Sequence, residues 1–154
     1  MGGHGVVFKL SGDQTGGAVS IVEHPVPPGG GAGPLHTHSR EDEVTYVIQG
    51  EINILIGDEL THAPAGSYVL KPRGVPHTFW NASNKPAQIL EIITPAGLEK
   101  YFEQVAPAFK PGEPPDVNLI MQTAAKFGLQ IHIDSIGKLV EKYGVIVPGG
   151  PPQS

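Results

Sequence analysis

Short apolar runs separated by turn residues make up the chain as far as residue 95. The runs are rich in β-branched and aromatic residues, which favour strands, and the segments between them are rich in Gly, Pro, Asn and Asp, which favour turns. Many short strands at close spacing predict an all-β sandwich or barrel. The predicted strands are 6–10, 18–23, 44–49, 52–56, 59–62, 67–71, 78–80 and 87–93.

The pattern becomes helical at Thr94 and Pro95, a pair that suits an N-cap followed by the first residue of a helix. Apolar residues then recur at helical spacing over residues 98–105. We therefore expect a β-domain over residues 1–95 and a helical C-terminal extension over residues 96–154.

Two further helices of the extension are predicted to end in the same way. A helix capped by Asp116 ends before Gly128, and a helix over residues 135–143 ends before Gly144. A short apolar strand is expected after each glycine. The apolar faces of the extension are expected to cover the outside of the barrel or a dimer interface, and the alternative is a lid over the pocket.

Composition and charge narrow the function classes. The chain has 154 residues, a length typical of one domain, and its net charge of −5 with no basic run argues against a nucleic-acid surface. It has no cysteine, which excludes disulfides, thiolate nucleophiles and Cys-ligated zinc. No apolar run approaches membrane-spanning length, and the N-terminus has no signal-peptide pattern. A cytoplasmic protein is therefore expected.

Two segments carry residues that commonly bind metals. His36 and His38 are two residues apart, so on a strand both imidazoles face the same side. Three consecutive acids follow at 41–43, and His77 lies in the second segment. Imidazole nitrogens combined with a carboxylate suit a divalent transition metal such as iron, manganese, nickel, cobalt, copper or zinc.

These two segments resemble the motifs of the cupin family. Residues 30–50 fit the first motif, G(X)5HXH(X)3,4E(X)6G, and residues 66–81 fit the second, G(X)5PXG(X)2H(X)3N, at all ten specified positions. The resemblance covers about residues 5–95. It implies a jelly-roll barrel, also called a double-stranded β-helix, that brings four ligands together on one divalent metal. The implied ligands are His36, His38, Glu43 and His77.

Glu43 is selected from the three consecutive acids by its spacing. It is the only one of the three acids that has both a motif spacing from His38 and six intervening residues before the motif glycine, Gly50. Strand alternation turns Asp42 to the opposite face, and Glu41 falls in the turn. The remaining histidines, among them His24, are predicted to be surface or packing residues.

Strand alternation also predicts the substrate pocket. Thr45 and Val47 share the face of Glu43, and Phe79 shares the face of His77, so these three residues are expected to line it.

Other residues near the motifs are expected to face away from the pocket. Tyr46 and Trp80 have the opposite parity and are expected to face packing or a partner subunit. Arg40 and Arg73 lie in predicted turns, and neither is expected to face inward. The apparent lack of an inward cation favours a neutral or aromatic substrate that chelates the metal.

The ligand set implies several possible reactions. Four protein ligands on a six-coordinate ion leave two positions, enough for a chelating substrate or for substrate and O₂ together. Residues 36–51 look like those of small bacterial cupins akin to the quercetinase-like dioxygenases, which implies oxidation of a flavonol-like, phenolic or enolisable substrate, with Glu43 as the candidate catalytic base. One alternative is a metal-dependent isomerase, decarboxylase or lyase. The other is a non-catalytic cupin that binds a small molecule or a metal.

The expected partners are a small-molecule substrate and a second copy of the chain, with no nucleic acid and no membrane. An exposed sheet edge invites pairing, and strand 6–10 is expected at such an edge. The family resemblance likewise implies a homodimer.

Overall fold

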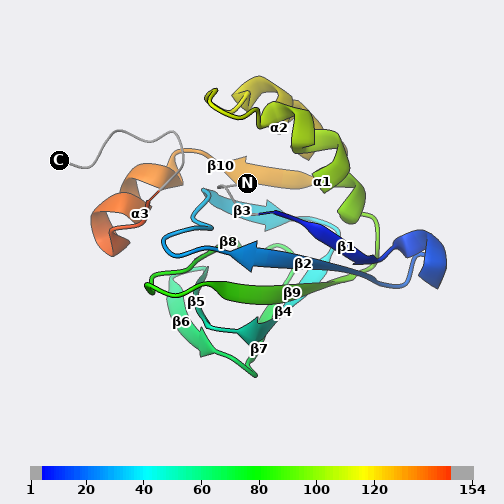
Figure 1. The fold of residues 1–154 in the computed structure, drawn as a ribbon. Helices are drawn as coiled ribbons and strands as arrows, with labels where there is room; N and C mark the ends of the chain where they lie inside the picture. The colour runs from blue at the N-terminus through cyan, green and yellow to red at the C-terminus, as the bar shows by residue number, and fades with distance from the viewer. Residues whose placement is uncertain (1–4, 147–154) are drawn as a thin grey trace.

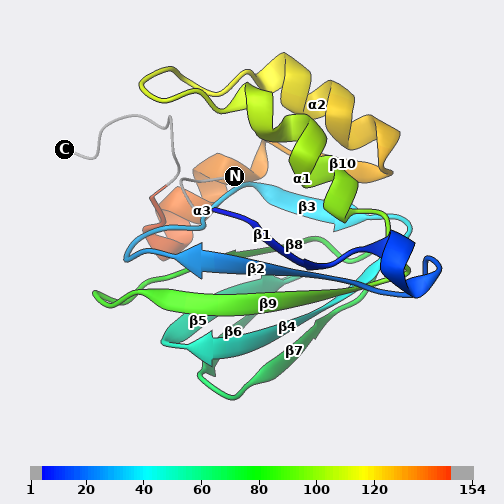
Figure 2. The ribbon, with the colours of Figure 1, turned by 45° about the vertical axis from the view of Figure 1, so that its right-hand side comes forward.

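The computed structural model describes residues 5–146 and shows two antiparallel sheets stacked face to face (Figures 1 and 2). This arrangement of mostly strands fits the expected jelly roll. One sheet has the order β1 (Val7–Leu10), β2 (Ser20–Val26), β9 (Ala87–Thr94), β4 (Asp42–Gln49) and β7 (Tyr68–Lys71). The other has the order β10 (Leu129–His132), β3 (Leu35–His38), β8 (His77–Trp80), β5 (Glu51–Ile56) and β6 (Glu59–Pro64).

Alternating burial along β4 shows how the sheets enclose the interior. Glu43, Thr45 and Val47 are buried, whereas Val44 and Tyr46 are only partly buried on the other face. This period of two is the one predicted from the sequence. The apolar inward residues of both sheets form a core cluster of Val26, Val47, Ile52, Ile54, Ala63, Ala87 and Ile89.

The turn between β4 and β5 requires a glycine. Gly50 has a φ of +75°, and a Cβ at this position would lie 2.7 Å from the carbonyl oxygen of Pro86. A side chain would therefore be strained and would clash with the backbone. This motif glycine is needed for the tight turn that carries the chain from one sheet to the other.

Three helices follow β9, namely α1 (Glu99–Val105), α2 (Val117–Lys126) and α3 (Ser135–Tyr143), and 3₁₀ turns occupy Gly12–Thr15 and Ala106–Ala108. The Asp116 carboxylate accepts a hydrogen bond from the Leu119 N–H at 3.0 Å, which confirms it as the cap of α2. Gly144 has a φ of +63° and ends α3 as predicted.

The first helix begins later than predicted. Thr94 is the last residue of β9 and pairs with Asp42, so it is not an N-cap. Gly97 has a φ of +132°, outside the helical range, and α1 begins only at Glu99. The Glu99 carboxylate accepts hydrogen bonds from the N–H groups of Gly97 and Gly12, at 2.6 and 2.8 Å, which ties the start of this helix to the barrel.

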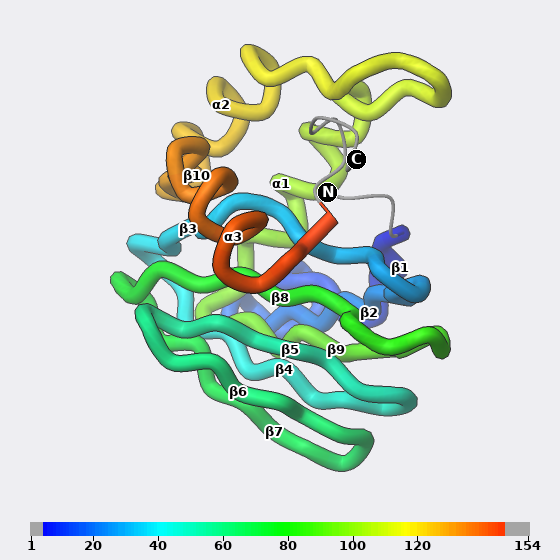
Figure 3. The backbone as a smooth tube through the Cα atoms, turned by 90° about the vertical axis from the view of Figure 1, so that its left-hand side faces the viewer, coloured from blue at the N-terminus to red at the C-terminus, as the bar shows by residue number. Residues whose placement is uncertain are grey.

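The extension divides into two parts. The segment from α1 to β10 lies over one end of the barrel (Figures 1 and 2), and its Leu98 and Leu129 share a core cluster with Val22 of β2. Helix α3 lies against the second sheet (Figure 3), where the Tyr143 ring centroid is 5.5 Å from that of Trp80. Trp80 therefore packs away from the barrel interior, as predicted. Residues 147–154 of the extension lie outside the described residues.

Strand β1 is one of the two edge strands of the first sheet, as predicted for residues 6–10, and β7 is the other. The homodimer inferred from this edge stays a prediction. Within residues 5–146, no helix has the length and apolar character needed to span a membrane.

Candidate metal centre

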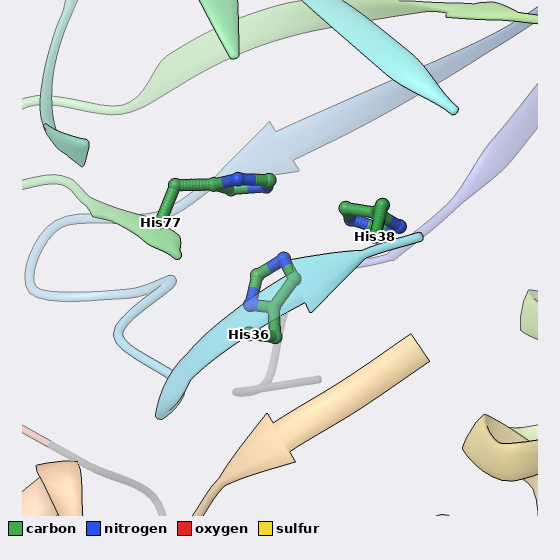
Figure 4. Close-up of side chains that lie close together, drawn as sticks. All are labelled: His36, His38 and His77. Atoms are coloured by element: carbon green, nitrogen blue, oxygen red, sulfur yellow. The ribbon is translucent and has the colours of Figure 1, made fainter. Parts of the chain in front are cut away.

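Two neighbouring strands bring three histidines together (Figure 4). His36 and His38 project from the same face of β3, and His77, the first residue of β8, pairs directly with His36 across the two strands. One ring nitrogen from each histidine lies within 4.8 Å of the other two. The strand spacing of two and the cross-strand register thus produce a cluster of three imidazoles that could hold a metal ion.

Glu43 reaches this cluster from the opposite sheet. Its Oε2 lies 3.1 Å from Nε2 of His77 and 3.5 Å from Nε2 of His38, and its side chain is buried. Of the rival acids, Asp42 points outward and forms an ion pair with Arg73 at 2.9 Å. The structure therefore places Glu43 beside His38 and His77 and turns Asp42 away.

Backbone carbonyls orient two of the imidazoles. Nδ1 of His36 lies 3.2 Å from the carbonyl oxygen of Pro34, and Nδ1 of His77 lies 3.3 Å from that of Val75. A carbonyl oxygen only accepts hydrogen bonds, so each Nδ1 must carry the proton. The Nε2 lone pairs are then free to bind a metal, and these carbonyls supply the orienting contacts that metal-binding histidines need.

His38 shows that the site fits a metal. Within residues 5–146, neither of its ring nitrogens has a hydrogen-bond partner, although the side chain is buried. An unsatisfied buried polar group costs about 1–3 kcal/mol. A metal on Nε2 would satisfy one nitrogen, and the other faces Oε2 of Glu41 at 3.7 Å. Three imidazoles and a carboxylate are a donor set that divalent transition metals accept.

Burial favours the neutral imidazoles of His36 and His77, the form that metal binding requires. Desolvation lowers the pKa of His77 below its usual value. The pKa of His36 is held well below its usual value, first by desolvation and then by the neighbouring imidazoles of His77 and His38. Little free energy is therefore spent on deprotonating these ligands at neutral pH.

A buried lysine next to the histidines was not expected from the sequence. Nζ of Lys71 lies 3.1 Å from Oε2 of Glu43 and 2.8 Å from Oε1 of Glu91, and Lys71 is only 2% exposed. The Thr45 hydroxyl donates a hydrogen bond to the same Glu91 oxygen at 2.9 Å. The expectation of no inward cation is therefore wrong. Lys71 is already paired with two carboxylates, however, so it is not a free anion-binding group.

This ion cluster fixes the charge of Glu43. Burial by itself would raise the pKa of Glu43, but the ammonium group of Lys71 holds that pKa well below its usual value. The pKa of Lys71 is raised, because the two carboxylates outweigh the effect of burial. Burial raises the pKa of Glu91. Glu43 is thus an ionised carboxylate, as a metal ligand must be.

A cavity of about 280 Å³ opens beside the histidines. Phe79 lines it as predicted, together with His36, His38 and Glu43. Its other polar side chains from the barrel are Lys71, Glu91, His24 and Thr78.

Two predicted pocket residues do not line this cavity. Thr45 and Val47 share the inward face of Glu43, but Thr45 hydrogen-bonds to Glu91 and Val47 packs in the core between the sheets. The cavity lies at the histidine end of the barrel, so positions further along β4 are buried below it. Strand parity gives the face of a side chain but not its depth.

His24 is a packing residue that also belongs to the cavity wall. Its ring lies 5.5 Å from the ring of Phe102, and its Nδ1 lies 3.2 Å from the carbonyl oxygen of Gly5. Burial lowers its pKa to about 4. It is therefore neutral at pH 7.

Comparisons with known proteins support the cupin superfamily. Residues 23–93 match the family described as the cupin domain, Cupin_2. No curated protein matches the chain.

Solved structures of similar fold include a predicted oxalate decarboxylase from Thermotoga maritima, with 24% identity and a TM-score of 0.55 over 58% of this chain and 77% of that chain. They also include the protein TT1209 from Thermus thermophilus, with 26% identity and a TM-score of 0.51 over 61% and 83%. A sugar phosphate isomerase from a cupin superfamily, from Silicibacter pomeroyi, has 24% identity and a TM-score of 0.50 over 58% and 59%. At these identities the likeness concerns the fold.

Proposed function

We propose that this protein is a metal-dependent dioxygenase that oxidises a small chelating substrate, flavonol-like, phenolic or enolisable. The observation that carries the proposal is a cluster of three imidazoles with the Glu43 carboxylate beside it, of which His36, His38 and Glu43 line a largely apolar cavity. His36, His38, His77 and Glu43 are the proposed ligands of one divalent transition metal. When bound, the metal supplies Lewis-acid activation and, if it is redox-active, electron transfer to O₂.

The protein groups prepare the substrate for this chemistry. Glu43 lies at the cavity wall and is the candidate acceptor for the proton of an enol or phenol. Nζ of Lys71 lies 3.1 Å from Oε2 of Glu43 and favours the ionised form of this carboxylate, which can accept the proton. Phe79 and the apolar wall of the cavity exclude water from the reacting atoms.

Metal-dependent isomerase, decarboxylase or lyase activity is the second candidate, because the same ligands support Lewis-acid chemistry without O₂. The names of two structural neighbours, an oxalate decarboxylase and a sugar phosphate isomerase, point to such reactions. The cavity argues against their small, highly polar substrates. Its cation, Lys71, is already paired with Glu43 and Glu91, and much of the remaining wall is apolar.

Oxygen uptake by metal-loaded protein, measured with a panel of flavonols, catechols and diketones, tests the proposal. We expect consumption of O₂ with at least one substrate, retained in His62→Ala and lost in His36→Ala. His62 is the matched control because it is exposed and contacts only Glu51 and Asn53 among the contacts described for it. Turnover without O₂ would favour the Lewis-acid reactions. Binding with no product would favour a non-catalytic binding protein.

A further inference from the structure

The cavity has two chemically different walls. The barrel wall contains His36 and His38, two of the proposed ligands, and the ion cluster around Lys71. The extension wall consists of the cavity-lining residues after residue 97, and these include Phe102, Phe109, Ile120 and Met121. Within residues 98–146, this wall contains no charged residue, and Tyr101 has its only side chain with a polar hydrogen-bonding group.

The extension wall begins directly beside the proposed ligands. In the pairing of β10 with β3, Ile131 lies opposite His36 and Leu129 lies opposite His38, and both apolar residues line the cavity. Side chains opposite each other on paired strands are about 5 Å apart at their Cβ atoms. In a molecule bound at the histidines, the atoms one or two bonds from the chelating group therefore contact the apolar side chains of Leu129 and Ile131.

The cavity opening is also apolar. Val117, Met121 and Ile133 line the cavity and are nevertheless 51%, 38% and 44% exposed. Large apolar side chains gathered and exposed at the mouth of a pocket commonly mark a route for an apolar ligand. The volume of about 280 Å³ is at the lower end for small-molecule sites, which limits the occupant to a single compact molecule.

We infer that the substrate joins its chelating group directly to an apolar body, and that the extension wall selects this body. Alkyl- or aryl-substituted diketones, enols and catechols fit this description. Sugars, phosphates and short dicarboxylates do not, because the extension wall offers almost no partner for their polar groups. The chelating half of this inference rests on the proposed function, and the apolar half rests on the extension wall alone.

Binding of linear 2,4-diketones of increasing chain length, starting with pentane-2,4-dione, tests the inference by calorimetry on metal-loaded and metal-free protein. Each methylene that enters the cavity should tighten binding about threefold to fourfold, until the cavity is full. A terminal hydroxyl on a long chain should weaken binding by about tenfold or more. Affinity that is flat along the series, or unaffected by the hydroxyl, would overturn the inference.

A matched pair of variants locates the effect. Met121→Glu places a charge at the cavity, whereas Gln122→Glu makes the same change one residue along α2, at an exposed position that does not line it. Met121→Glu should remove most of the chain-length gain, and Gln122→Glu should keep it. Equal behaviour of the two variants would overturn the role of the extension wall.

A second measurement covers the possibility that Met121→Glu destabilises the fold. In the unaltered protein, a long-chain diketone should slow amide hydrogen exchange in α1, α2 and β10, while exchange in β6, away from the cavity lining, should not change. Unchanged exchange in the extension would contradict the inference.

The two proposals fail in different ways. If no metal binds, the chelating group loses its effect, but the chain-length gain persists in metal-free protein. If the extension wall does not select the body, metal-dependent binding persists without a chain-length gain.

Discussion

The barrel wall and the extension wall of the cavity are held together by different forces. The barrel wall holds His36 and His38, two carboxylates and a lysine, and the carboxylates and the lysine depend on one another for their charge. The extension wall is ordinary apolar packing, joined to the ligand strand by the pairing of β10 with β3. We therefore assign the proposed reactivity to the barrel wall and the proposed substrate selection to the extension wall.

This contrast also predicts which substitutions should lower the free energy of unfolding most. Buried charges require their partners, so loss of a partner on the barrel wall should be severe. Apolar contacts are non-directional, and exposed ion pairs contribute little, so changes elsewhere should be smaller.

The largest effect is expected when the buried cation is removed. Lys71→Met leaves the carboxylates of Glu43 and Glu91 buried without their cation, which should lower the free energy of unfolding by about 3–5 kcal/mol in metal-free protein. Chemical denaturation measures this loss. Arg73→Met, which removes an exposed ion pair with Asp42 next to Glu43, is the control and should have a much smaller effect. Equal losses in the two variants would contradict the account of the barrel wall.

A pH-dependent loss of stability is expected at the junction of the two walls, where His24 of β2 faces Phe102 of α1. The pKa of His24 is lowered to about 4 from an ordinary value of 6.5. As the pH falls, the unfolded state therefore takes up the proton on His24 before the folded state does. The contribution of neutral His24 to the free energy of unfolding is complete above pH 6.5 and is lost as the pH falls toward 4. The loss attributable to His24 should approach about 3 kcal/mol.

Denaturation of metal-free protein between neutral and acidic pH measures this dependence. His24→Asn keeps a donor for the Gly5 carbonyl oxygen but cannot be protonated, so its stability should fall less over the same range. The histidines of the metal centre remain in both proteins, and the difference between the two curves isolates His24. Parallel curves would show that His24 is not protonated on unfolding.

A smaller effect is expected where the extension joins the ligand strand. Gly128 and Gly144 end α2 and α3 with similar φ values of +65° and +63°. A Cβ on Gly128 would clash with Oγ of Ser39, whereas a Cβ on Gly144 would meet nothing within 4 Å. Both alanine variants should lose about 1 kcal/mol from backbone strain, and Gly128→Ala should lose at least about 1 kcal/mol more.

Thermal denaturation of the two variants measures this difference. Because Gly128 precedes the strand that pairs with β3, Gly128→Ala should also weaken metal binding, and Gly144→Ala should not. Identical melting temperatures and metal affinities would show that β10 does not brace the ligand strand.

The sequence was sufficient to predict the strands of the barrel and the cluster of histidines. Strand alternation placed His36 and His38 on one face, and the motif spacing separated Glu43 from its acidic neighbours, as the structure now places them. Lys71 could not be found in this way. A lysine at a strand end is normally exposed, and only the pairing of β7 with β4 puts it opposite Glu43.

The extension shows the same limit at a larger scale. The Asp116 cap and the glycines Gly128 and Gly144 predicted α2 and α3, because capping depends on neighbours in sequence. Which surface the helices cover depends on long-range packing. The sequence therefore left open whether they cover the outside of the barrel or lie over the pocket. The structure shows both, with α3 against the second sheet and α1 and α2 beside the cavity.

Metal content measured by elemental analysis tests the central claim most directly. Protein produced without added metal, and the same protein after equilibration with divalent ions and removal of the excess, should hold about one transition-metal ion per chain. His77→Ala should lose this ion, and His62→Ala should keep it. An unaltered protein that retains no metal after equilibration, or a His77→Ala variant that retains as much as the unaltered protein, would contradict the account.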